Sequence, residues 1–172
     1  MQKNFSYPVK INELNQNTYR YTLEADKAEL ADITAILKVE AVKFFKGQIA
    51  LKFNKKENML HVWGEVAAVL VLKSVISLEN FEQKITTPFE LWFDTKATYQ
   101  DIRDMEADIN DEVPDIVING EINLADICIE QIALKIDEYP RAEGEIFDFS
   151  QYAETTEEIK ESPFAVLSKL KK

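Results

Sequence analysis

Leu-His-Val-Trp-Gly-Glu-Val-Ala-Ala-Val-Leu-Val-Leu, residues 60–72, is the first of two segments that decide the fold. The second is Lys-Ile-Thr-Thr-Pro-Phe-Glu-Leu-Trp-Phe-Asp, residues 84–94. Apolar residues occupy the even positions of the first segment and the odd positions of the second, an alternation typical of strands with one buried face. In an antiparallel hairpin, both apolar sets share a face only if the numbers of facing residues sum to an odd value, which we expect at about 157. Pro88 favours an edge or a bulge in the second strand.

Shorter patterns supply the other elements. Asp26 followed by Glu29 is a capping-box pattern, which predicts a helix that ends at Lys38. Asn123 is the expected N-cap of a second helix, Leu124–Lys135, which is apolar around most of its circumference and therefore packs on the sheet. Further strands are expected at Phe5–Ile11, Thr18–Leu23, residues 48–54 and residues 116–122.

These elements predict one α+β domain over residues 1–149. Its mainly antiparallel β-sheet has long hairpin strands packed against one or two helices. A chain of 172 residues with 46% hydrophobic content can bury such a core. The strand and helix patterns place four side chains in that core: Leu70, Phe89, Leu91 and Ile132.

Charge is distributed unevenly along the chain. Residues 1–90 hold 12 basic and 11 acidic side chains, whereas residues 91–172 hold 8 basic and 20 acidic ones, which gives the net charge of −11. The first half is therefore free to present a basic surface to RNA phosphates. Five lysines lie close together in this sequence: Lys43, Lys46, Lys52, Lys55 and Lys56. They are interpreted either as phosphate contacts or as a solvated strand edge.

The odd sum of facing residue numbers also places Trp63 and Trp92 near each other, on the more polar face of the hairpin. Aromatic side chains on a solvated sheet can stack on unpaired RNA bases, and tryptophan also anchors protein interfaces. Alternatively, a helix or the C-terminal tail covers them, because large exposed apolar patches are uncommon on monomers.

The residues needed for catalysis or metal binding are scarce. The chain has one cysteine, Cys128, and one histidine, His61, which are too few to complete the ligand shell of a zinc ion. Its four glycines do not form the pattern of a phosphate-binding loop. The acidic run from Asp94 to Asp115 lacks the glycine of a calcium loop and is expected to be solvated. We therefore expect no enzymatic activity, cofactor, metal or small-molecule substrate.

The remaining expectations concern the cell and the chain's end. The chain has no membrane-spanning apolar run and no secretion signal at its start, so we expect a cytoplasmic protein without a membrane partner. Residues 150–172 are expected to form an acidic tether and a short amphipathic helix. One face of this helix, Phe164, Leu167 and Leu170, docks either on its own domain or on another protein.

Four blocks of the sequence resemble the YceD-like family of large ribosomal RNA accumulation proteins. They are Gly64-Glu65-Val66 through Ser77-Leu78-Glu79, Ile122-Asn123-Leu124-Ala125-Asp126 through Glu130-Gln131-Ile132-Ala133-Leu134, Tyr139-Pro140-Arg141-Ala142-Glu143-Gly144, and Ser162-Pro163-Phe164-Ala165-Val166-Leu167. The resemblance implies a role in making or stabilising 23S rRNA, as for the bacterial and plastid members. Many members carry C-x-x-C where this chain has Ser74 and Ser77, and serine does not replace a thiolate ligand.

Two functional hypotheses follow. The first is a non-enzymatic factor that supports 23S rRNA synthesis, processing or stability in large-subunit biogenesis, by binding rRNA, a large-subunit ribosomal protein or an assembly factor. The second is an acidic protein–protein interaction module whose second half binds a basic partner such as a ribosomal protein. The salt dependence of binding distinguishes them, since phosphate neutralisation gives a steep log–log slope.

Overall fold

The structure, a computed structural model, describes residues 5–98, 100–101 and 114–147. The chain divides into two compact units, Met1–Ala142 and Glu143–Lys172. All the elements below belong to the first unit, and the described residues 143–147 of the second form a turn and irregular backbone. The predicted tail helix with Phe164, Leu167 and Leu170 lies outside the described residues.

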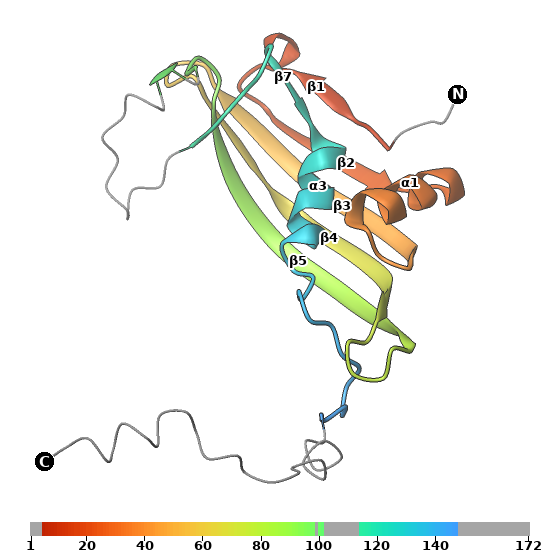
Figure 1. Cartoon of the computed structure of the whole chain (residues 1–172). Coiled ribbons are helices and arrows are strands. Elements are labelled where there is room, and N and C mark those ends of the chain that lie inside the picture. Colours follow the sequence, from red (N-terminus) through yellow and green to blue (C-terminus); the bar gives the residue numbers. More distant parts are fainter. Residues whose placement is uncertain (1–4, 99, 102–113, 148–172) are drawn as a thin grey trace, which may run out of the picture. The chain divides into compact units, whose positions relative to one another are not determined.

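A five-stranded sheet dominates the first unit, and its strand order is β2-β3-β4-β5-β6 (Figure 1). All its neighbouring strands are antiparallel except β5 and β6, and a separate two-stranded sheet pairs β1 with β7. The fold is therefore α+β, as predicted. The elements are β1 (Pro8–Lys10), the 3-10 helix η1 (Ile11–Glu13), β2 (Thr18–Glu24), α1 (Lys27–Leu37), β3 (Ala41–Asn54), β4 (Met59–Lys73), β5 (Asn80–Asp94), β6 (Asp115–Ile116), β7 (Glu121–Asn123) and α3 (Leu124–Ala133).

The predicted hairpin consists of β4 and β5, and the numbers of its facing residues sum to an odd value, as expected. Facing residues sum to 153, as for Leu60 with Phe93, so the sum is odd but four below the expected value. The shift arises because β5 begins at Asn80 rather than at residue 84. Pro88 lies on an edge, as predicted, since β6 pairs only with Phe93 and Asp94 at the end of β5.

Both helices begin at the predicted caps. The Asp26 carboxylate accepts hydrogen bonds from the backbone N–H groups of Ala28 and Glu29 (2.9 Å each), and Glu29 completes the capping box. The Asn123 side chain accepts from the backbone N–H of Ala125 (3.2 Å) and caps α3. α1 and α3 end at residues 37 and 133, slightly earlier than expected.

Both helices lie on one face of the sheet (Figure 1). α3 crosses β3, β4 and β5, while α1 packs on β3. A glycine permits the close approach of α3, because an ideal Cβ at Gly47 would lie 2.5 Å from the Sγ of Cys128. The buried thiol is a core group, as predicted, and desolvation raises its pKa to about 12. Leu70, Phe89 and Ile132 are buried as predicted, but Leu91 is only half-buried.

The opposite face of the sheet carries none of the described helices (Figure 1). We call it the open face, formed by the side chains of β2–β5 that point away from α1 and α3. Along β4 the side chains of the helix-covered face are buried, whereas those of the open face are half-buried or exposed. The hairpin therefore presents one solvated surface, as the alternation predicted. Within the described ranges, no helix has the length and apolar character to span a membrane.

Candidate nucleic-acid interface

Three rings stack on the open face, and His61 is their common member. The His61 and Trp92 ring centroids are 3.9 Å apart with planes inclined by 6°, and the His61 and Trp63 centroids are 4.4 Å apart with planes inclined by 24°. Sheet geometry explains the stack: Trp63 is two residues along β4 from His61, and Trp92 is the direct cross-strand partner of His61. We call these residues the ring stack.

The ring stack is fixed at its centre and accessible at its edge. The His61 Nε2 lies 2.7 Å from the Glu90 Oε1, so a hydrogen bond to the partner strand holds the imidazole in place. Trp92 is 46% exposed, which leaves much of the indole in contact with solvent. A pre-ordered, partly exposed indole can receive a second flat ring without a large loss of side-chain entropy.

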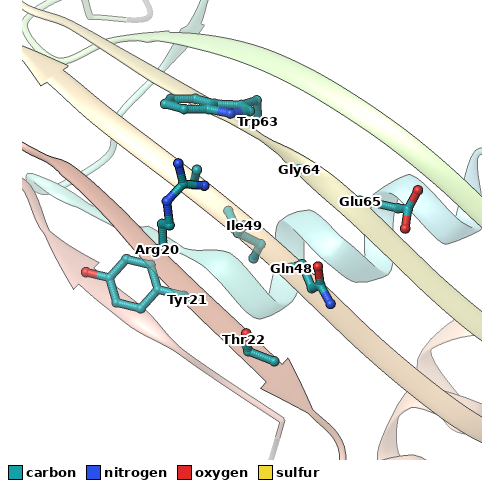
Figure 2. Close-up of a pocket in the computed structure, with 9 residues that line it drawn as sticks. Arg20, Tyr21, Thr22, Gln48, Ile49, Trp63, Gly64 and Glu65 are labelled. Carbon is teal, nitrogen blue, oxygen red and sulfur yellow. The ribbon is translucent and has the colours of Figure 1, made fainter.

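A groove of about 470 Å³ runs beside the ring stack across β2, β3 and β4 (Figure 2). Arg20, Ala50 and Trp63 are successive partners across these strands, and in Figure 2 the Arg20 guanidinium points toward the Trp63 indole. The residue between them, Ala50, has a small side chain and is buried. Gln48 and Glu65 line the groove and offer hydrogen-bonding groups.

The backbone under this groove is unusually close-packed. An ideal Cβ at Gly64 would lie 2.1 Å from the carbonyl oxygen of Gln48, so only glycine allows β4 to approach β3 there. Gly64 is an even-numbered residue of β4, so a Cβ there would lie on the helix-covered side, and the glycine fixes the spacing of the two strands behind the groove.

Two cations beside the rings have no carboxylate within ion-pair distance among the described residues. Arg20 borders the groove, and Lys52 is the cross-strand partner of His61. Both side chains are exposed. Such groups are free to contact an anionic ligand, whereas a paired cation would first have to give up its carboxylate.

The five lysines singled out in the sequence do not gather at one place. Lys43 and Lys46 form ion pairs with Glu82 and Glu24, the second at 3.0 Å, and the hydrogen bond from Lys43 lowers the pKa of Glu82. Lys52 alone lies beside the ring stack. Since a strand rises about 3.3 Å per residue, Lys43 and Lys52 are about 30 Å apart along β3. Lys55 and Lys56 lie in the turn between β3 and β4.

The structure also places the residues considered for metal binding. Within residues 5–98, 100–101 and 114–147, no three His, Cys, Asp or Glu side chains gather as a metal site would require. His61 and Cys128 lie on opposite faces of the sheet, the first on the open face and the second on α3. Ser74 Oγ accepts from the backbone N–H groups of Ile76 (3.1 Å) and Ser77 (3.3 Å), so it orders the hairpin loop. That the chain takes no metal stays a prediction.

Sequence reasoning identified the two tryptophans but missed the histidine and the arginine. His61 was weighed only as a metal or catalytic group, although its position two residues before Trp63 in a strand already puts both on one face. Arg20 lies on β2, outside the lysine-rich segment, and only the β2–β3–β4 register brings it to Trp63.

The chain matches the model of a known protein family. A family model described as large ribosomal RNA subunit accumulation protein YceD matches residues 62–171. This range includes Trp63, Trp92 and all of α3. No curated protein and no solved structure matches the chain.

Proposed function

The chain belongs to the YceD family of large ribosomal RNA subunit accumulation proteins, and from this premise we propose that it supports accumulation of 23S rRNA by binding that RNA on the open face. The family role concerns the RNA of the large subunit. The direct contact with RNA, its place on the protein and the absence of catalysis are our additions.

The observation that carries the proposal is the ring stack with unpaired cations beside it. RNA-binding sheets commonly stack unpaired bases on exposed aromatic rings, and each stacked base contributes about 1–3 kcal/mol. Trp92 supplies an exposed ring, and Arg20 and Lys52 supply positive charge within reach of the flanking phosphates. Together they match the two needs of a single-stranded nucleic acid, which are stacking and charge neutralisation.

We propose a binding role rather than a chemical one. Beside the rings on the open face, the imidazole of His61 is already in contact with the Glu90 carboxylate. An RNA-cleaving or RNA-modifying site would need a general base positioned on the substrate, and we assign none to this surface. The site of action we propose is the cytoplasm, where large-subunit rRNA would be bound during assembly.

The proposal predicts that the unpaired cations, Arg20 and Lys52, contribute more to RNA affinity than the ion-paired Lys43 and Lys46. We expect Arg20→Gln with Lys52→Gln to weaken binding to a single-stranded large-subunit rRNA fragment. The slope of log affinity against log salt should fall by about 1.4, or about 0.7 for each lost phosphate contact. The matched control is Lys43→Gln with Lys46→Gln, which removes the same charge from the same face of the sheet. Fluorescence anisotropy at several salt concentrations measures both.

Equal loss in the two double variants would contradict the localisation at the ring stack. A parent protein that binds the RNA with no salt dependence would contradict phosphate contact altogether. The acidic-module hypothesis predicts a third pattern: both variants behave as the parent, and reversing acidic charges between Asp101 and Asp115 abolishes capture of a basic ribosomal protein. Residues 102–113 of that segment lie outside the described residues.

A further inference from the structure

A second hollow, of about 530 Å³, lies where β3 turns into β4 and β5 ends. Four chain segments meet there: the end of β1 with η1, the turn between β3 and β4, the residues after β5, and the turn between β6 and β7. In Figure 1 these segments converge at the upper end of the sheet. The hollow is separate from the groove of Figure 2, because no residue lines both.

Three lysines from three of these segments line the hollow. Lys10 ends β1, Lys55 follows β3, and Lys96 follows β5. All three are exposed, and none forms an ion pair within the described part of the chain. Glu121 is the one carboxylate among the lining residues, so their formal charge is +2. Gathering like charges is unfavourable unless solvent or an anion offsets their repulsion.

Backbone hydrogen bonds hold the walls of this hollow together. The Ile11 N–H donates to the Gly120 carbonyl (2.9 Å), which joins η1 to the turn before β7. The Thr95 N–H (2.9 Å) and hydroxyl (2.8 Å) both donate to the Asn58 carbonyl, which joins the end of β5 to the turn before β4. The backbone positions that carry the lysines are therefore fixed before any ligand arrives, which reduces the cost of binding.

The turns themselves require residues that tolerate left-handed backbone. Asn58 has φ of 57°, and the successive residues Asn119 and Gly120 have φ of 55° and 69°. Asparagine and glycine adopt these angles at low cost. Asn58 and Asn119 also add side-chain amides to the lining. The hollow thus combines a rigid backbone frame, amide donors and three ammonium groups.

We infer that this lysine pocket binds a phosphate group. Ammonium groups are point charges that suit the oxygens of phosphate, and three of them can share a multiply charged anion. The phosphate is either inorganic or part of RNA. Thr95, in the lining of the pocket, follows Trp92 of the ring stack by three residues along the chain.

The test uses the full-length chain and two ligands at constant ionic strength. Nuclear magnetic resonance follows the backbone amides of Asn119 and Gly120 while inorganic phosphate replaces chloride, and then while a single-stranded RNA is added. We expect the parent to show saturable shifts at these amides with at least one ligand. The variant Lys10→Gln, Lys55→Gln and Lys96→Gln should lose them. The matched control, Lys27→Gln, Lys73→Gln and Lys135→Gln, removes three exposed lysines elsewhere and should keep them.

Each outcome has a definite reading. Shifts with both ligands or with RNA alone assign the pocket to RNA phosphate. Shifts with inorganic phosphate alone assign it to a free phosphate, even if the proposal for RNA on the open face fails. The inference is overturned if neither ligand shifts these amides in the parent. It is also overturned if the pocket variant, with an unchanged amide spectrum elsewhere, responds as the parent does.

Discussion

Replacing Trp63 and Trp92 together by alanine should abolish most RNA binding while the protein stays folded. If each indole carries one stacked base, each loss costs about 1–3 kcal/mol, or about five- to 150-fold in affinity. The double variant should therefore bind a single-stranded large-subunit rRNA fragment at least about 25-fold more weakly. Because stacking involves no charge, the slope of log affinity against log salt should stay unchanged. This separates the tryptophans from Arg20 and Lys52.

The control for this experiment lies on the same face. Phe44 is 38% exposed and lies on β3 beyond the ion-paired Lys46, eight residues or about 26 Å from Lys52. Phe44→Ala removes an exposed aromatic ring from the open face without touching the ring stack, so it should bind RNA as the parent does. Equal weakening by Phe44→Ala would mean that binding follows general surface hydrophobicity. Parent-like affinity of the tryptophan variant would refute the stacking role.

Phe89→Ala should lower the free energy of unfolding by about 3–5 kcal/mol, the usual cost of emptying a buried phenylalanine site. Phe89 is 8% exposed and belongs to the same buried cluster as Ile132 of α3. A cavity there removes contacts between the hairpin and the helix. Urea denaturation followed by far-ultraviolet circular dichroism measures the change, and comparable slopes with denaturant would support a two-state comparison.

Trp92→Ala is the matched control, because Trp92 lies three residues from Phe89 on β5 but points to the open face. It removes a larger aromatic side chain, yet we expect a much smaller loss of stability, since 46% of the residue is already exposed. The two substitutions should therefore separate stability from RNA binding. A cost below about 1 kcal/mol for Phe89→Ala would contradict the assignment of faces.

The sequence predicted which face each hairpin residue occupies but not its cross-strand partner. A sum of 157 would pair Trp92 with Glu65, whereas the observed sum of 153 pairs it with His61. A register shift by an even number of residues leaves each side chain on the same face of the sheet, since side chains alternate with a period of two. The shift comes from the loop of residues 74–79, where backbone bonds join the Ser74 N–H to the Glu79 carbonyl (2.9 Å) and the Leu78 N–H to the Ser74 carbonyl (3.1 Å).

The other sites depend on contacts between distant parts of the chain. Lys10 faces Glu121 only because β1 pairs with β7, and no local pattern in either segment specifies that partner. The short strand near residue 9 was expected, and so was a strand near residue 118, but their pairing was not. Local capping patterns, by contrast, placed the first turn of both helices correctly, since the residues that cap a helix are its sequence neighbours.

The most direct test of the central claim measures ribosomal RNA in cells that lack this protein. We expect the ratio of mature large-subunit to small-subunit rRNA to fall in such cells and to recover when the parent protein is restored. Cells given the Trp63→Ala and Trp92→Ala variant, at equal protein level, should keep the low ratio, whereas cells given Phe44→Ala should recover. Full recovery with the tryptophan variant, or an unchanged ratio when the protein is absent, would contradict the claim that the open face acts on large-subunit rRNA.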